Sequence, residues 1–166
     1  FWPLLTGSAR LEIEARDDSA FVRGTLIARP GRVVLRDASL AAEARRLPGL
    51  TTLPVPQTER VYGQIDEIVF VDGACEAASG TVSTPILARL GPRYEVELPE
   101  IEGTLGCAGE ALGIGYEGLS EALAVTGSLR LDDEGFRWTS EARTETPGVV
   151  AVLIALGFEE TGRVWL

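Results

Sequence analysis

The stretch GSLRLDDEGFRWTSEA, residues 127–142, decides the fold class of this 166-residue chain. Leu129 and Leu131 alternate with polar residues before an acidic turn, and Phe136 and Trp138 alternate with polar residues after it. A period of two sends successive side chains to opposite faces of a β-strand. The stretch therefore predicts a hairpin with one apolar face and one polar face. It contains no recognisable nucleophile, metal cluster or phosphate loop.

The same alternation continues through most of the chain. Residues 9–15, 20–28 and 32–44 predict three antiparallel strands joined by short turns. The alanine-rich end of the third segment also fits a helix by propensity, but we favour a strand that ends in a turn at residues 47–49. The proline-rich segment 48–56 predicts a surface loop, and strand patterns resume from residue 60.

Two segments depart from this period and predict short helices. In residues 146–157, Thr146 is a candidate N-cap, Pro147 a helix start and Gly157 a helix stop. A run of apolar residues lies between them, so a buried strand is the alternative. Residues 84–91 have the same signature on a smaller scale and predict a single helical turn.

A short motif recurs along the strands: a glycine, a small or polar residue, and an aliphatic residue. Glycine inside a strand marks a bulge or a sharp bend. The fold class predicted is mainly β: a curved antiparallel sheet, as a meander, half-barrel or roll, with one or two short helices. The motif occurs at Gly24-Thr25-Leu26, Gly63-Gln64-Ile65, Gly80-Thr81-Val82, Gly103-Thr104-Leu105 and Gly127-Ser128-Leu129.

The composition excludes several classes of function. The chain has a net charge of −10, its fifteen basic residues are all Arg, and it contains no His. Such an acidic chain repels nucleic acid and anionic lipid surfaces. The absence of His removes a common general base and metal ligand. No apolar run is long enough to span a membrane, and no signal segment opens the chain. The absence of Met suggests a piece of a longer protein.

Carboxylate pairs are the only candidate catalytic material, and they predict no active site. Asp66 and Glu67 are neighbours on a strand and should point to opposite faces, while the acids at 132–134 and 159–160 indicate turns. The scattered aromatic residues, including Phe136 and Trp138, are interpreted as core. No catalytic residue, metal site or cofactor is expected, and the chain is not predicted to be an enzyme.

The two cysteines, Cys75 and Cys107, form no C-x-x-C pair, so a zinc site is not supported. Two free buried thiols and a disulfide in an oxidising compartment both remain open from these residues alone.

The order of the motifs resembles a known family, the periplasmic part of type II secretion system protein N (general secretion pathway protein N). The opening FWPLLTGSARLEIEA is similar to the family's start. DGACEAASGTV and IEGTLGCAGEALGIGYEG resemble its two cysteine segments. VTGSLRLDDEGFRWTSEART followed by LIALGFEETGRVWL resembles its closing pattern. The resemblance spans nearly the whole chain, although each motif is short.

This resemblance implies a single periplasmic β-domain, residues 1–166, from a protein held in the inner membrane by one N-terminal span that these residues lack. It implies an accessory or assembly role, with other secretion-system components as partners: the inner-membrane platform or a linker protein. The family offers no catalytic residue to transfer. It does imply a disulfide between Cys75 and Cys107.

We predict that the partner binds an exposed strand or apolar patch. The apolar opening of the chain suits an edge strand, and Phe1, Trp2, Leu4 and Leu5 are the candidate partner-facing residues. The alternative is that these residues only close the core. The rival function is a periplasmic carrier that holds an apolar ligand or lipid on a curved sheet.

Overall fold

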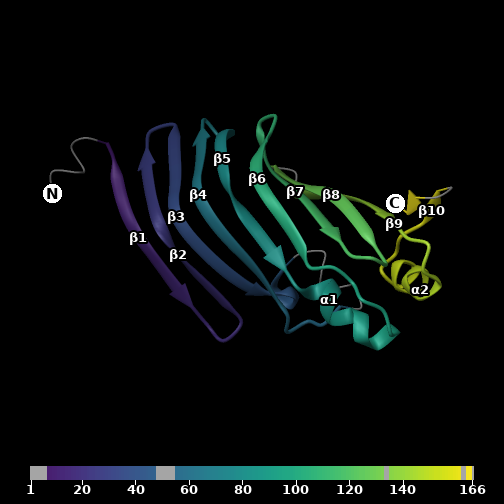
Figure 1. Ribbon diagram of the computed structural model, residues 1–166. Helices are drawn as coiled ribbons and strands as arrows, with labels where there is room; N and C mark the ends of the chain where they lie inside the picture. Colours follow the sequence, from purple (N-terminus) through teal and green to yellow (C-terminus); the bar gives the residue numbers. More distant parts are fainter. Residues whose placement is uncertain (1–6, 48–54, 133–134, 162–163, 166) are drawn as a thin grey trace.

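The computed structural model describes residues 7–47, 55–132, 135–161 and 164–165. Within them, strands that follow one another in the chain pair as an antiparallel meander, and the sheet bends and twists without closing (Figure 1). The predicted mainly β, curved antiparallel fold is confirmed. The strands are β1 (Ala9–Arg16), β2 (Ala20–Arg29), β3 (Arg32–Glu43), β4 (Arg60–Val71), β5 (Ala74–Thr84), β6 (Ile101–Ala108), β7 (Ala111–Leu119), β8 (Ala124–Asp132), β9 (Gly135–Arg143), β10 (Glu160–Thr161) and β11 (Val164–Trp165).

Two short α-helices and two 3₁₀ turns accompany the sheet. They are α1 (Ile86–Leu90), α2 (Pro147–Ala155), η2 (Ala44–Arg46) and η3 (Gly91–Tyr94). Both predicted helices are therefore present, and Gly157 follows α2 with a φ of +87°. Thr146 occupies the N-cap position as predicted, but its side chain makes no capping hydrogen bond. None of the described helices has the length and apolarity needed to cross a membrane.

Three local predictions have mixed outcomes. The alanine-rich segment extends β3 to Glu43, as favoured, and the backbone then forms η2. The surface-loop prediction is wrong for Val55. The apolar side chain of this residue, which stands between two prolines, packs in the core beneath the helices and is buried. Glu160 was assigned to a turn but lies in the short strand β10, paired with β11. Residues 48–54 and 133–134 lie outside the described residues.

The sheet has one apolar face and one face that carries the charged side chains from β1 to β9, although bulges interrupt the register and Val34 and Val69 are buried on the charged face. Leu11 pairs with Leu26, Leu26 with Leu35, and Leu35 with Ile68. On the far side of the sheet, Leu129 pairs with Trp138, and Leu131 with Phe136. Among the described strand residues that pair across the sheet, every Asp, Glu and Arg falls outside this register, while Asp37, Asp66 and Glu76 stand at bulges. Those charged residues include Arg10, Glu12, Arg36, Glu67, Glu102, Glu117 and Arg130.

The apolar face is the concave one. Leu112 of β7 packs against the cluster formed by Ala38, Ile65 and Ile68 of β3 and β4. A flat sheet would place β7 about 14 Å from β4 at the usual spacing between strands, so the contact requires the sheet to bend toward its apolar side. This curvature agrees with the bend that the recurring glycines predicted.

Glycines on the two faces of the sheet show the same asymmetry. A Cβ added at Gly103, on the apolar face, would lie 2.8 Å from Val82 Cγ2 and 3.1 Å from Ile114 Cγ2. A Cβ added at Gly115, on the opposite face of the neighbouring strand, would meet no atom within 4 Å. Side chains therefore converge on the inner face and diverge on the outer one.

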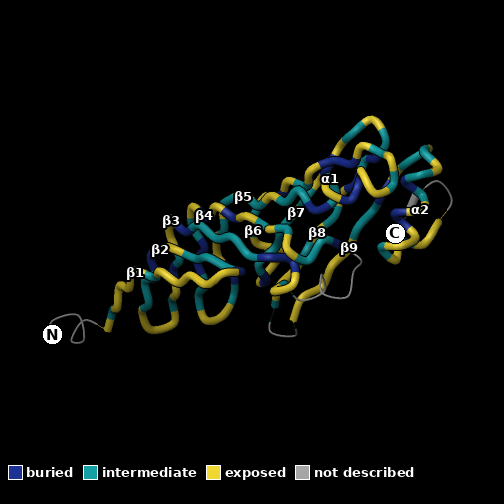
Figure 2. The backbone as a smooth tube through the Cα atoms, turned by 90° about the horizontal axis from the view of Figure 1, so that it is seen from below, coloured by how far each residue is buried: buried dark blue, intermediate teal, exposed yellow. Residues whose placement is uncertain are grey.

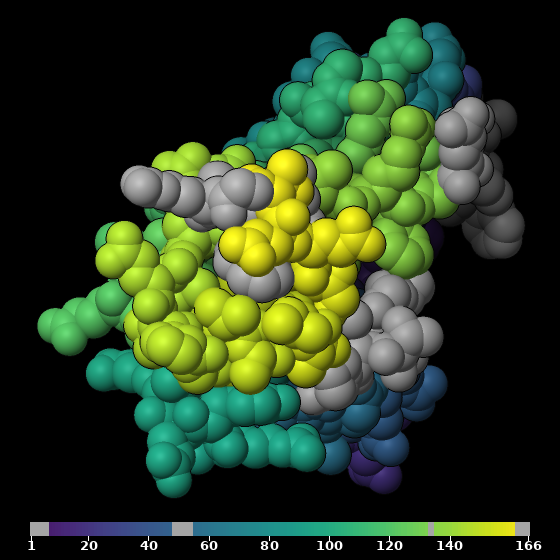
Figure 3. Space-filling view, turned by 90° about the vertical axis from the view of Figure 1, so that its right-hand side faces the viewer, coloured from purple at the N-terminus to yellow at the C-terminus, as the bar shows by residue number. Residues whose placement is uncertain are grey.

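The connections cover only one end of the concave face. The turns β2–β3, β4–β5 and β6–β7 contain two residues each, whereas β3–β4, β5–β6 and the segment after β9 are long and carry η2, α1, η3 and α2. Buried residues gather beside α1 and α2, while β1 is exposed along nearly its whole length (Figure 2). Viewed from the C-terminal side, α2 and the residues after it form the front of the molecule (Figure 3).

Candidate functional site

The concave face divides into a covered part and an open part. In the covered part, Val149, Val152 and Leu153 of α2 pack against Val125 and Ala142 of the sheet. In the open part, large apolar side chains remain in contact with solvent. They are Leu11 (53% exposed), Val33, Leu131 (50%), Phe136 and Trp138 (43%), and we call these five residues the open apolar surface. Exposed apolar residues that share one face mark candidate interaction sites.

The open apolar surface includes one polar cluster, and its members bond to one another. Trp138 and Tyr116 form an edge-to-face pair with ring centroids 6.2 Å apart. Trp138 Nε1 donates a hydrogen bond to Tyr116 Oη, which also bonds to Ser140 Oγ and donates to the Thr139 carbonyl oxygen at 3.0 Å. Burial raises the pKa of Tyr116 above its ordinary value of 10.0, and the hydrogen bonds from Ser140 and Trp138 oppose this shift only in part.

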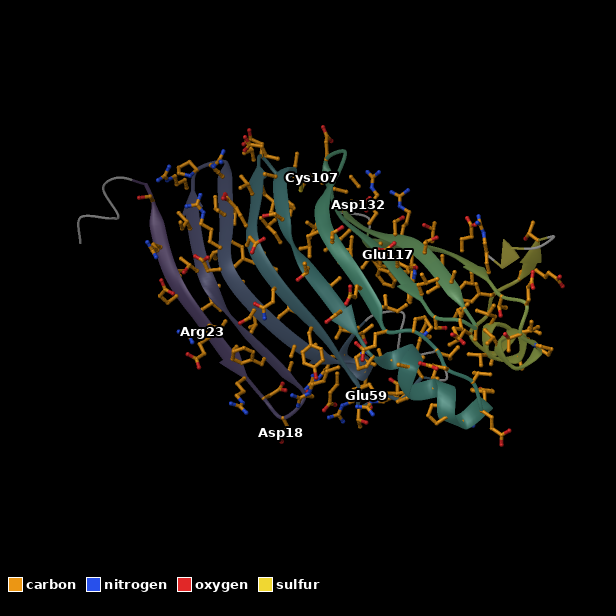
Figure 4. All side chains as sticks on the ribbon, in the orientation of Figure 1. Asp18, Arg23, Glu59, Cys107, Glu117 and Asp132 are labelled. Atoms are coloured by element: carbon orange, nitrogen blue, oxygen red, sulfur yellow. A yellow bond between two sulfur atoms is a disulfide. The ribbon has the colours of Figure 1, made fainter. Side chains whose placement is uncertain are left out.

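A disulfide joins the two halves of the sheet at the uncovered end. Cys75 of β5 and Cys107 of β6 have their Cα atoms 5.7 Å apart and their Sγ atoms 2.07 Å apart. The β5–β6 ladder is limited to residues 81–84 and 101–104, so the bridge ties the two strands where their pairing has ended. Figure 4 shows Cys107 at the end of the sheet opposite Asp18 and Glu59.

The first strand offers a second candidate surface, its outer edge. All eight residues of β1 pair with β2, without a bulge, and no described residue pairs with the other side. On the convex face β1 presents Arg10, Glu12, Glu14 and Arg16 in that order, and all four are exposed. An unpaired edge presents free backbone donors and acceptors to another strand.

The turn that follows β1 is fixed by one carboxylate. Asp17 Oδ1 accepts hydrogen bonds from the Ser19 backbone N–H at 2.7 Å, from Ser19 Oγ at 2.8 Å and from the Ala20 N–H at 2.7 Å. The backbone hydrogen bond from Ser19 is the largest cause that lowers the pKa of Asp17, followed by the Ser19 hydroxyl and Ala20, and Arg46 adds an ion pair. These bonds fix the turn that joins β1 to β2.

A hollow on the convex face adjoins the end of β1. Its lining includes Phe21 together with the charged residues Arg16, Asp17, Asp18 and Arg60. A partner strand that pairs with β1 would pass beside this hollow.

The site residues expected from the sequence have different outcomes. Phe1, Trp2, Leu4 and Leu5 lie outside the described residues. Glu67 accepts hydrogen bonds from Arg36 on the convex face, while Asp66 stands at a bulge, so the division of this pair between the two faces stays a prediction. The described residues contain no group of three or more side chains suited to hold a metal.

Interpreting the aromatic residues of the last hairpin as core is wrong for Phe136 and Trp138. Their alternation identified the face correctly, but no helix covers that part of it. The signal that could have found them is the two-residue acidic turn at 133–134, which is too short to carry a covering segment.

Comparisons with known proteins agree with this architecture and with the motif order in the sequence. No curated protein and no solved structure gives a significant match to the chain. Residues 1–164 match the family described as type II secretion system (T2SS), protein N. The chain therefore belongs to the type II secretion system protein N family, whose members are components of that secretion machine.

Proposed function

We propose that this chain is the periplasmic binding module of an accessory secretion-system protein, and that it binds another component through the outer edge of β1. It would form one β-domain, anchored in the inner membrane by a segment outside these residues. The partner would be the inner-membrane platform or a linker protein. The observation that carries this proposal is the unpaired, regular, eight-residue edge.

The edge lacks the features that usually block pairing. Strands at sheet edges are commonly protected by proline, by bulges or by being very short. The register of β1 with β2 runs without a shift from Ala9 to Arg16, and the strand contains no proline. A partner strand could therefore add to the sheet along this whole length, which is the β-augmentation mode of peptide recognition.

The charges on β1 favour a partner over a second copy. Their order, Arg10-Glu12-Glu14-Arg16, reads the same in both directions. Antiparallel pairing of two β1 strands over residues 10–16, which keeps the two apolar faces on the same side, would place Arg10 opposite Arg16 and Glu12 opposite Glu14. Like charges that face each other across strands are destabilising. A partner strand with acidic residues at its ends and basic residues at its centre would be complementary in either direction.

Site-specific photocrosslinking of the full-length protein in intact cells tests this proposal. A photoreactive residue in place of Glu14 should trap a platform or linker protein. The matched control places the same residue at Thr104, which is exposed on the convex face in the middle of the sheet. Crosslinks to secretion-system components at Thr104 but not at Glu14 would contradict the proposal.

A charge-reversal pair sharpens the experiment. The Glu12→Arg, Glu14→Arg double variant should weaken the crosslink and secretion, because it removes the charge pattern that the partner would recognise. The Glu102→Arg, Glu117→Arg control changes the net charge equally at two residues that pair within the sheet. Equal loss in both variants would indicate an effect of overall charge and would overturn the edge as the binding surface.

A further inference from the structure

We infer that the open apolar surface is a second binding site, which takes the hydrocarbon chain of a lipid. This site is separate from the outer edge of β1. It consists of the concave face between Leu11 and Val33 on one side and Leu131, Phe136 and Trp138 on the other.

The first argument is charge. The described strand residues that pair in the register of the concave face include no Asp, Glu or Arg, although the chain as a whole contains 40 such residues, 25 acidic and 15 basic; Asp37, Asp66 and Glu76 stand at bulges, outside the paired positions. An occupant that lies along the paired positions of this face meets uncharged side chains. A hydrocarbon chain is complementary to such a surface, because it has no charge or dipole that needs a partner.

The second argument is the lack of free hydrogen-bonding groups. Tyr116, Trp138 and Ser140 bond to one another, and Thr84 Oγ1 donates to the Arg60 carbonyl oxygen at 3.1 Å. These are the polar side chains at the paired positions of the concave face in the described strands. Protein–protein interfaces usually carry about one hydrogen bond per 100–200 Å². The paired positions of the described strands on this face offer no unused polar side chain to supply them.

The third argument is shape, and it disfavours a second copy as the occupant. The face is concave, since Leu112 reaches the cluster around Ile68 across the bend. Two concave faces placed against each other would enclose a void rather than a packed interface. A flexible chain can instead follow the curved floor, and the helices close one end of it.

Quenching by a dibrominated stearic acid tests this inference, because bromine quenches tryptophan fluorescence only at close range. The Trp2→Phe, Trp165→Phe background of the 166-residue chain leaves Trp138 as its single tryptophan. We expect saturable quenching of Trp138. Leu131→Asp should weaken binding by about tenfold or more, because a carboxylate on this face loses solvent when the chain binds.

The matched control is Thr104→Asp, which adds the same charge on the opposite face and should retain binding. Phe136→Ser is a second test variant if Leu131→Asp does not fold, as judged by a thermal transition. The Glu12→Arg, Glu14→Arg variant should bind the fatty acid normally, so failure of the edge proposal and failure of this one are distinguishable.

Extraction and mass spectrometry of the protein purified from cell envelopes provide an independent readout. We expect co-purified fatty acid or phospholipid with the parent chain and at least tenfold less with Leu131→Asp. The absence of quenching in the parent would overturn the inference, as would equal loss in Thr104→Asp. Concentration-dependent dimers that are broken by Leu131→Asp, without bound lipid, would assign the face to a second copy instead.

Discussion

The covered and open parts of the concave face have the same sequence pattern and different environments. Val125 and Ala142 lie beneath α2 and are buried, whereas Leu131 and Phe136, on the same two strands, are exposed. Alternation along the strands determines which face is apolar. The lengths of the connections determine which part of it is covered, because only the long connections carry helices and all of these lie at one end.

The largest expected effect on stability comes from placing a carboxylate in the covered part of the concave face, and the same change in the open part provides the comparison. Leu153 in α2 is 2% exposed, so Leu153→Asp buries an unpaired carboxylate and should destabilise the fold by more than about 4 kcal/mol. Leu131→Asp on the open part should cost less than about 1 kcal/mol. Denaturant unfolding measures both. Similar losses would mean that the open part is covered in solution.

The disulfide gives the next largest effect. It closes a loop with a sequence separation of 32 at the end where no helix ties β5 to β6. Replacing both Cys75 and Cys107 by Ala should lower the free energy of unfolding by about 3–4 kcal/mol, on the chain-entropy account of disulfides. The measurement is urea unfolding of the variant and of the parent. Unchanged stability would show that strand pairing alone holds the two halves together.

Much of this fold follows from the sequence. The meander, the two helices and the strong curvature were predicted from alternation, from Pro147 with Gly157, and from the recurring glycines. Local chemistry specifies each of these features, because strand period and helix termini depend on neighbouring residues.

The candidate sites were predicted less well, because exposure is a property of the whole fold. Nothing within residues 136–138 indicates whether a helix will lie over them, so Phe136 and Trp138 were assigned to the core. Val55 was misassigned in the opposite direction, from a proline-rich segment to the surface. In both cases a distant segment decides burial, and the local pattern does not encode where that segment packs.

Replacing a glycine by alanine on each face of the sheet should change the free energy of unfolding by a smaller amount. Gly103→Ala should cost about 1–3 kcal/mol, since the new methyl would lie 2.8 Å from Val82 Cγ2 and 2.9 Å from the Gly115 carbonyl oxygen. Gly115→Ala, which points into open space, should be neutral or stabilise by up to about 1 kcal/mol. Thermal unfolding of the two variants provides the comparison. Equal costs would contradict the assignment of the apolar face as the concave one.

The smallest effect concerns pH and the only titratable hydroxyl described on the concave face. Burial raises the pKa of Tyr116 above 10.0, so the folded state holds this proton more tightly than the unfolded state. Its contribution to stability is complete below the unfolded pKa of 10.0 and is lost as the pH rises through the higher folded value. Unfolding free energies measured from neutral pH to above 10 should therefore fall more steeply for the parent chain than for Tyr116→Phe. Because ionisation would place a charge next to Trp138 on this face, alkaline pH should also weaken binding of an apolar chain there in the parent more than in Tyr116→Phe. Identical pH profiles for the two proteins would show that the Tyr116 hydroxyl is solvated, and that the open apolar surface extends further toward α2 than the contacts of Tyr116 indicate.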